Sequence, residues 1–213
     1  MSAVGVFGAA LRRASRGERA GLRLLDRAGR PLRRIDAAWY GELRPGDSGL
    51  LDRCGADTID LGCGPGRITG ALVAGGRRAL GVDVSAQAVR YARLRGAPAV
   101  HGSLFEQLPG EGDWTTAVLA DGNIGIGGDP VRLLDRCRHL VAGDGALLVE
   151  VDPPGSRTWQ GEVVLDDGDR ISERFGWAFV AVDDIARLAD AAALRLVETW
   201  TEADRWFVRL ARP

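Results

Sequence analysis

The feature that most constrains the fold of this chain is a regular alternation of apolar strand-like runs and helical segments that begins at residue 57. The run DTIDL (57–61) precedes the helical stretch RITGALVAG, and ALGVDV precedes AQAVRYARLRG. The same order continues through PAVHG, TTAVLAD, a helical stretch over 129–143, and ALLVEVD. Strands separated by helices pair in parallel, because only a long crossover brings the chain back in the same direction. The sequence therefore predicts an α/β fold with a seven-stranded, mostly parallel sheet and helices on both faces.

The two ends of the chain depart from this alternation. Residues 194–211, LRLVETWTEADRWFVRLA, give two strands with a short polar turn, so the last strand should run antiparallel. Residues 1–48 combine a short amphipathic helix with a hairpin pattern over 21–35, and a second hairpin is predicted over 161–175. A helical turn capped by Asp36 is expected over 36–44, after which Pro45, Gly46 and Gly49 loosen the chain. We expect residues 1–48 to form a lid segment on a domain of residues 49–213, with the second hairpin closing from the other side.

Composition argues against several classes of function. The net charge is −1, and all 28 cationic residues are arginine. The first 48 residues hold ten arginines against five acids, which we interpret as a solvated face, with no nucleic-acid partner expected. Cys54, Cys63 and Cys137 are too widely spaced for a disulfide framework or a metal site. No apolar run approaches the roughly 18–20 residues that span a bilayer. We expect a cytoplasmic protein with no membrane partner and no metal.

A loop with glycine at every second position, DLGCGPG (60–66), joins the first strand of the alternation to its helix. Glycine there lets a ligand lie against bare backbone, at the edge of the sheet where open α/β folds bind nucleotides. Asp83 closes the next strand, 19 residues after Gly64. An acid at that place accepts hydrogen bonds from both hydroxyls of a ribose. The pattern predicts a ligand that contains a ribose.

The loop differs from the one that binds dinucleotides. Arg67 stands where the dinucleotide fingerprint has its third glycine or alanine. Asp60 lies just before the loop, and an acid there disfavours an anionic pyrophosphate. It favours a ligand that carries an ammonium or other positive group, and S-adenosylmethionine combines such a group with adenosine.

The segment DLGCGPGRITGAL resembles the first motif of class I S-adenosylmethionine-dependent methyltransferases, and ALGVDVSAQAVRYAR resembles their second motif. The resemblance runs from about residue 57 to the C-terminus and implies a Rossmann-like sheet and S-adenosylmethionine as cofactor. It implies that Asp83 binds the ribose hydroxyls and that Val84 lies near the adenine. Ser103 and Leu104 stand where the family often has an acid that meets the adenine amino group. The residues implied for the methionine end are Asp60, the backbone of Gly62, Cys63 and Gly64, and Tyr40 from the lid.

The methyl acceptor should lie above the ends of the strands TTAVLAD and ALLVEVD. Asn123 is our candidate for a contact with the acceptor, the alternative being that it only braces a glycine-rich turn. Asp121 is expected to approach the cofactor. Asp152 is a candidate base or cation-binding residue, or else a turn residue before two prolines. Cys63 is not a candidate nucleophile, because nothing near it in the sequence would lower its pKa.

The sequence thus predicts an enzyme that transfers a methyl group in line to a small-molecule acceptor, as a monomer or a homodimer. Tryptophans in or near the lids (Trp39, Trp159 and Trp177) suit an apolar or aromatic acceptor, the alternative being that these rings only bury the lids against the core. The alternatives are an RNA or protein methyltransferase, which only the basic N-terminal segment supports, and a non-catalytic protein that binds S-adenosylmethionine.

Overall fold

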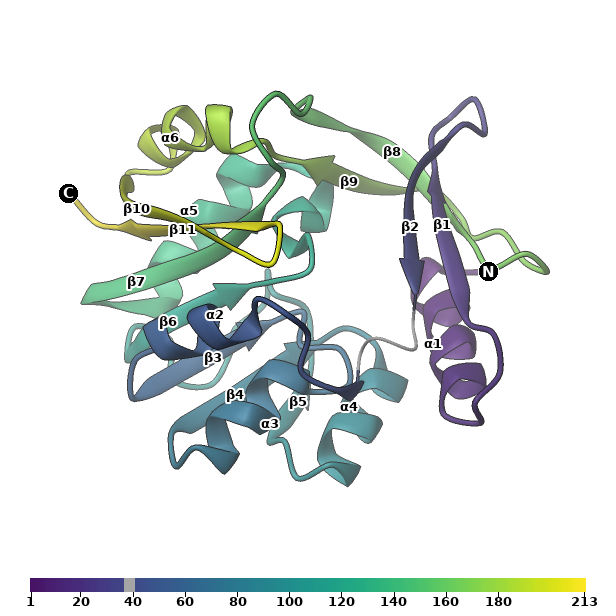
Figure 1. Ribbon diagram of the computed structural model, residues 1–213, viewed down its shortest axis with the longest axis horizontal. Coiled ribbons are helices and arrows are strands. Elements are labelled where there is room, and N and C mark those ends of the chain that lie inside the picture. The colour runs from purple at the N-terminus through teal and green to yellow at the C-terminus, as the bar shows by residue number, and fades with distance from the viewer. Residues whose placement is uncertain (37–40) are drawn as a thin grey trace.

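The structure, a computed structural model, describes residues 1–36 and 41–213. Figure 1 shows two layers of strands that face one another. A seven-stranded sheet with helices forms the larger part, and a smaller sheet lies beside helix α1. Residues 37–40 are outside the described part of the chain, and the expectations for Trp39 and Tyr40 therefore lie outside it too.

The larger sheet has the order β10-β11-β7-β6-β3-β4-β5. Strands β3 to β7 pair in parallel, and β11 runs antiparallel to both of its neighbours. This confirms the predicted mostly parallel sheet with an antiparallel last strand. Its strands are β3 (Asp57–Leu61), β4 (Arg78–Asp83), β5 (Ala99–His101), β6 (Trp114–Leu119), β7 (Val141–Val151), β10 (Arg195–Glu202) and β11 (Arg205–Ala211).

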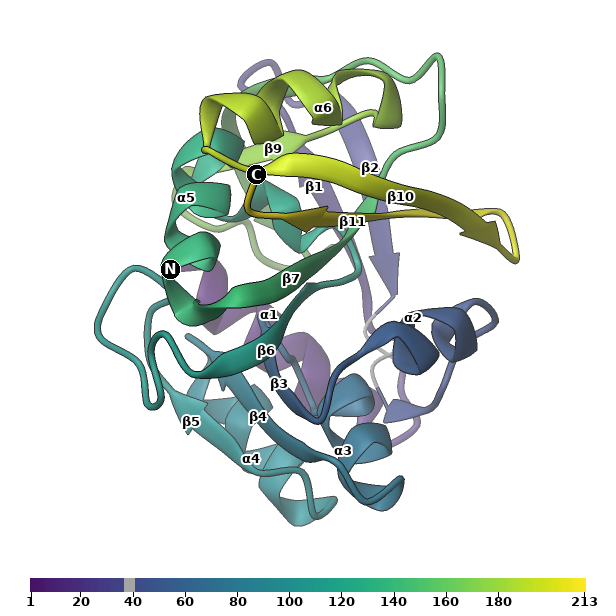
Figure 2. The same ribbon diagram turned by 90° about the vertical axis from the view of Figure 1, so that its left-hand side faces the viewer.

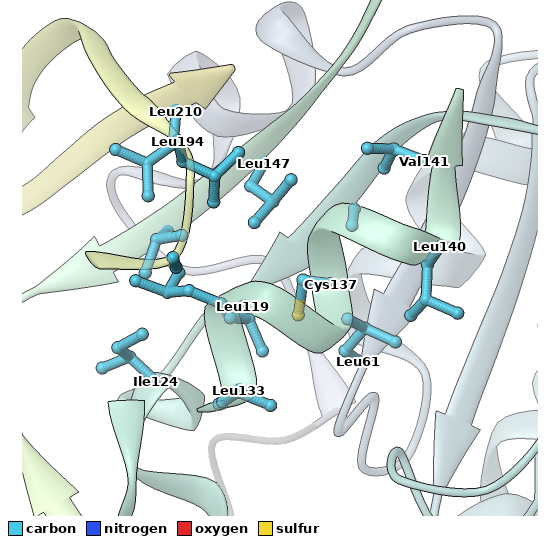
Figure 3. Packing of buried hydrophobic residues seen from close by; sticks show 14 of the residues in the cluster. Leu61, Leu119, Ile124, Leu133, Cys137, Leu140, Val141, Leu147, Leu194 and Leu210 are labelled. Atoms are coloured by element: carbon cyan, nitrogen blue, oxygen red, sulfur yellow. The ribbon is translucent and has the colours of Figure 1, made fainter. Parts of the chain in front are cut away.

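Helices cover both faces of this sheet (Figure 2). Successive side chains of a strand therefore pack alternately against the helices of one face and of the other. The flanking helices are α2 (Asp47–Arg53), α3 (Arg67–Ala74), α4 (Ala86–Leu94), α5 (Pro130–Leu140) and α6 (Val182–Ala191). In β7, Leu147 and Val149 pack into the cluster with α5 and α6, whereas Leu148 packs into the cluster with α2 and α3. Figure 3 shows the first cluster, in which Cys137 and Leu133 of α5 meet Leu119 of β6. Burial on both faces explains why these strands read as continuous apolar runs.

The two predicted hairpins form a single antiparallel sheet with the order β2-β1-β8-β9, which we call the lid sheet. It contains β1 (Gly21–Leu25), β2 (Pro31–Asp36), β8 (Trp159–Asp166) and β9 (Phe175–Phe179). The joining contact pairs β1 with β8, so that Leu24 lies opposite Leu165. The expectation of two separate lids on opposite sides is therefore wrong: both hairpins were recognised, but their pairing is a contact between distant segments, which local patterns do not encode.

The lid sheet is held to the larger sheet at both of its sides. Helix α1 (Ala3–Ala14) packs on α4, where the Ser15 and Tyr91 hydroxyls lie 2.9 Å apart. At the other side, Asp152 bridges to Ala181, and the chain of β9 runs directly into α6. The inner face of the lid sheet thus faces the carboxyl ends of β3, β4 and β6.

Two local predictions need correction. The helix expected over 129–143 ends at Leu140, because Val141 adopts an extended conformation and starts β7 opposite Trp114. Residues 45–49, expected to be loose, lead into α2, which begins at Asp47 after Gly46 adopts a φ of 90°. Asp36 is the last residue of β2, and the helical turn expected to follow it begins outside the described residues.

Candidate functional site

The glycine loop after β3 is held in a tight shape by its own backbone. Gly62, Gly64 and Gly66 have φ values of 77°, 53° and 82°, which L-residues with side chains rarely adopt. A Cβ on Gly66 would lie 2.7 Å from Cβ of Ala97 and 2.8 Å from that of Ala92. The glycine at 66 therefore lets α3 start close against α4, and the loop presents bare backbone along the edge of the sheet.

Asp83, at the end of β4, is fixed by two backbone groups. Its carboxylate accepts hydrogen bonds from the Gly64 N–H at 2.9 Å and the Ser85 N–H at 2.7 Å. Burial raises the pKa of this carboxyl, although the two hydrogen bonds oppose that shift. Each carboxylate oxygen keeps capacity for a further hydrogen bond, so Asp83 is oriented to accept from a ligand at the loop.

Asp60, at the end of β3, is buried beneath the same loop. Its carboxylate accepts from the Thr69 hydroxyl at 2.7 Å and the Thr69 N–H at 3.2 Å, which ties β3 to the first turn of α3. Burial raises its pKa to about 6, and the hydrogen bonds from Thr69 oppose that shift. Cys63 is also buried, and burial raises the pKa of its thiol, so it is not an activated nucleophile.

Asn123 begins a 3-10 helix, η2 (Asn123–Gly128), and its side chain reaches back to the glycine loop. Its Nδ2 donates to the carbonyls of Leu61 and Gly62, each at 2.9 Å. The amide therefore fixes the loop where β3 ends. The sequence suggested either a contact with the acceptor or a brace for its own turn, and the observed hydrogen bonds brace the glycine loop.

Asp121 belongs to a cluster of charges at the N-terminal ends of α2 and α3. It pairs with Arg44 at 2.7 Å and with Arg67, while its N–H donates to Glu150 at 2.6 Å. Asp47 pairs with Arg67 and Arg205 and is almost fully buried. Burial alone would raise the pKa of Asp47, but the hydrogen bonds from Arg67 and Arg205 hold it below the usual value. Nothing in the local sequence around these residues indicated this cluster, which five separate segments of the chain assemble.

Asp152 lies apart from the glycine loop, where β7 leaves the larger sheet. Both of its oxygens accept from Nη2 of Arg33, at 2.7 and 2.8 Å. The cation that Asp152 binds is thus a residue of the lid sheet. Together with Asp121, it lines a small cavity of about 180 Å³.

The remaining predicted residues lie where the adenine is expected. Val84 is exposed, Leu104 is buried in the main core, and the Ser103 hydroxyl accepts from the Phe105 N–H at 3.2 Å. His101 contacts the Val84 carbonyl at 3.0 Å. Among the described residues, no contact here singles out one that would recognise the adenine amino group.

A larger cavity of about 440 Å³ brings most of these residues together. One wall is the carboxyl edge of the larger sheet. The opposite wall, which sequence reasoning did not assign residue by residue, comes from α1 and the lid sheet. The first wall contains Asp60, Gly62, Cys63, Gly64, Asp83, Val84, Ser103, Leu104, Asp121 and Asn123, and the second contains Val4, Phe7, Leu24, Ile35, Leu165, Phe175 and Trp177.

The charges of the larger cavity suit a cationic ligand. Its described lining includes the carboxylates of Asp60, Asp83 and Asp121 and one cation, Arg67, which is already paired with two acids. A pyrophosphate would meet repulsion there, whereas an ammonium or sulfonium would be attracted. Bare loop backbone, the oriented Asp83 and the apolar surface of Val84 thus fit the parts of S-adenosylmethionine.

Comparison with known proteins agrees with this geometry. Residues 59–145 match the family model described as a methyltransferase domain. A crystal structure of an S-adenosylmethionine-dependent methyltransferase from Bacteroides fragilis, in complex with S-adenosylhomocysteine, superposes with a TM-score of 0.82 at 17% identity. Residues 59–145 are thus similar to a methyltransferase domain. The superposition covers 100% of this chain and 96% of the Bacteroides fragilis chain, so the likeness of the fold includes the lid sheet as well as the larger sheet.

Two further similarities extend over less of the chain. The Burkholderia thailandensis 1,6-didemethyltoxoflavin-N1-methyltransferase superposes with a TM-score of 0.56 at 18% identity, covering 77% of this chain and 73% of that one. A tabtoxin biosynthesis enzyme from Pseudomonas amygdali pv. tabaci is 37% identical over 71 residues. Those residues are 33% of this chain and 28% of that enzyme, so the similarity concerns only a short part of its length.

In the part of the chain that the structure describes, no helix has the length and apolar character to cross a membrane. Nor do His, Cys, Asp and Glu side chains gather there in a group of three or more that could hold a metal ion.

Proposed function

We propose that this protein binds S-adenosylmethionine at the glycine loop and transfers its methyl group to a small-molecule acceptor held under the lid sheet. The observation that carries the proposal is the larger cavity. Its volume of about 440 Å³ lies in the range of small-molecule sites. One wall has the acids and bare backbone that suit the cofactor, and the other is apolar.

Each residue at the carboxyl edge has a defined part in this proposal. Asp83 accepts the ribose hydroxyls while Gly64 and Ser85 hold it in place. Asp60 and the loop backbone attract the methionine end, and Asn123 keeps the loop in position. Tyr40 remains a further candidate for the methionine end and lies outside the described residues. When bound, S-adenosylmethionine supplies an activated methyl group on a positively charged sulfur.

The contribution of the chain to the transfer is alignment and exclusion of water. The apolar lid wall, with Phe7, Phe175 and Trp177, shields the cavity from solvent. Arginines hold both Asp121 and Asp152, so we assign these two acids to positioning. The role of Asp152 as a base stays a prediction. A cavity of this size favours a small acceptor over a segment of RNA or protein. The neighbours from toxin biosynthesis agree with that preference.

The proposal is tested in two steps with the purified protein. Isothermal titration should first detect binding of S-adenosylmethionine and S-adenosylhomocysteine, with no comparable binding of NADH. Incubation with S-adenosylmethionine labelled in the methyl group and a library of small aromatic and heteroaromatic acids, amines and phenols should then label a small product. Binding without transfer to any compound, together with transfer to RNA or protein, would contradict the small-molecule acceptor.

A further inference from the structure

The inner face of the lid sheet is apolar except at one position. The register places Leu24 opposite Arg33 and Leu22 opposite Ile35. On β8 and β9 the same face continues with Leu165, Phe175, Trp177 and Phe179. Among the described residues of these strands, Arg33 is the charged side chain on this face, because side chains alternate between the two faces of a sheet. A cation in an apolar wall of a ligand cavity calls for an explanation.

Arg33 is held in one orientation from two sides. Its guanidinium lies over the ring of Phe179, with the guanidinium carbon 4.3 Å from the ring centre. Its Nη2 donates to both oxygens of Asp152. Such contacts fix the planar guanidinium without occupying all of its donors. The side chain remains 38% exposed, so it is accessible from the cavity.

The donors of Arg33 are only partly used. Nε and Nη1 donate no hydrogen bond to any residue in the described part of the chain. Nη1 lies beside Gly122, where a Cβ would come within 3.4 Å of it. Gly122 and Arg33 both line the smaller cavity, which shares Ile35 and Asp121 with the larger one. Unused donors of a guanidinium thus face a space that adjoins the proposed acceptor site.

Each acid that lines the smaller cavity is already paired with an arginine. Asp152 is occupied by Arg33, Asp121 by Arg44 and Arg67, and both oxygens of Glu150 by Arg205. The unused donors of Arg33 therefore offer a positive charge to a ligand in this cavity. A carboxylate is the ligand group that matches a guanidinium edge in shape and charge.

We propose that the acceptor carries a carboxylate, which Arg33 binds in the smaller cavity while the apolar ring system of the acceptor lies beneath Phe175 and Trp177. This inference rests on the proposed function, since it names the class of acceptor for that site. Asp152 and Phe179 orient the guanidinium, and Arg33 sets both the direction of the acceptor and its selection over neutral analogues.

The test uses three naphthalene probes of equal ring size: 2-naphthoate, 2-naphthamide and 2-naphthylmethylamine. Each is titrated calorimetrically into the whole protein, with and without S-adenosylhomocysteine. The wild type should bind 2-naphthoate at least about tenfold more tightly than 2-naphthamide, because a charge-assisted pair is stronger than a neutral one. Equal affinities, no binding of 2-naphthoate, or tightest binding of the amine would each overturn the proposal.

Variants separate recognition from folding. In Arg33→Met the preference for 2-naphthoate should disappear. The matched control is Arg23→Met, which should keep the preference for 2-naphthoate. Arg23 belongs to the same sheet, lies opposite Arg34 in the register, and pairs with Asp166. Asp152→Asn should tighten 2-naphthoate binding about threefold or more, since it frees the charge of Arg33. Because Arg33→Met leaves Asp152 without its partner, Arg33→Met/Asp152→Asn is the second test and should also lose the preference. A preference that survives in both Arg33 variants, or weaker 2-naphthoate binding in Asp152→Asn, would count against the proposal.

The two proposals can fail independently. If S-adenosylhomocysteine does not bind while the Arg33-dependent preference holds, the methyltransferase function is wrong and the carboxylate site stands. If S-adenosylhomocysteine binds and the preference for 2-naphthoate is absent, the carboxylate site is wrong and the proposed methyltransferase function stands.

Discussion

The two walls of the larger cavity solve different physical problems. At the carboxyl edge of the seven-stranded sheet, the chain itself holds the acids in place: Asp83 by backbone N–H groups, Asp121 by arginines, and Asp60 by Thr69. On the inner face of the lid sheet the wall is apolar, and Arg33 keeps unused donors. In the proposed function, the first wall is therefore preorganised for the cofactor, whereas the second selects the acceptor.

The largest expected effect tests whether the first wall depends on its buried charges. Arg67→Met leaves Asp47, whose side chain is 1% exposed, with one arginine partner fewer. We expect a loss of about 3–5 kcal/mol in the free energy of unfolding, because breaking a buried ion pair leaves a charge uncompensated. Urea denaturation measures it. The control Arg187→Met removes a largely exposed pair with Asp184 and should leave the midpoint unchanged.

The second effect tests the lid wall. Trp177→Ala removes a ring that lines the cavity and packs beside η2. Binding of an aromatic probe such as 2-naphthoate should weaken about tenfold or more, from the lost apolar contact. The affinity for S-adenosylhomocysteine should change by less than about threefold, since the first wall is intact. Trp200→Ala, a control at a ring stacked on Phe207 in β10 and β11, should leave both affinities unchanged. Equal losses for probe and cofactor product would contradict the division between the walls.

The two walls also differ in how much of each could be predicted from the sequence. The first wall comes mostly from residues 57–123, and its signals are local: a strand, a glycine loop, a helix and an acid at the end of the next strand. Asp60, Gly62, Gly64 and Asp83 could therefore be placed from the sequence. The partners of Asp121 and Asp152 could not, because Arg44 and Arg33 reach them from more than 70 residues away.

The lid wall was predicted only as separate hairpins. Each hairpin has a local turn signal, but the pairing of β1 with β8 joins residues about 140 positions apart. Helix α2 was missed for a different reason. Pro45, Gly46 and Gly49 are poor helix formers, and burial of Leu50 together with the ion pairs of Asp47 outweighs their propensity.

A third prediction concerns the brace between η2 and the glycine loop. Asn123→Ala removes two hydrogen bonds to the carbonyls of Leu61 and Gly62. Binding of S-adenosylhomocysteine should weaken about tenfold, since each bond contributes roughly 1 kcal/mol and the loop would lose its fixed shape. The isosteric Asn123→Asp, which cannot donate, should weaken it as well. Unchanged affinity with slower methyl transfer would instead favour a direct contact with the acceptor.

The smallest effect is a pH dependence at Asp60. With a pKa of about 6, this carboxyl is mostly ionised at pH 7.5 and mostly protonated at pH 5.5. If the ionised form attracts the positive charges of S-adenosylmethionine, the affinity should fall about fourfold between these two values. The variant Asp60→Asn should bind S-adenosylmethionine more weakly at pH 7.5, and its affinity should lose the part of the pH dependence that is centred near pH 6. A profile identical to that of the wild type would show that Asp60 only holds α3 in place.

The proposed cofactor site depends most on Asp83, the group that binds the ribose in this proposal. Titration of S-adenosylhomocysteine into the wild type and Asp83→Ala tests this directly, with Asp135→Ala, at an exposed acid of α5, as the control. We predict measurable binding to the wild type and to the control, and a loss of about a hundredfold or more in Asp83→Ala, where two charge-assisted hydrogen bonds are removed. Binding to Asp83→Ala with the affinity of the wild type would contradict the account.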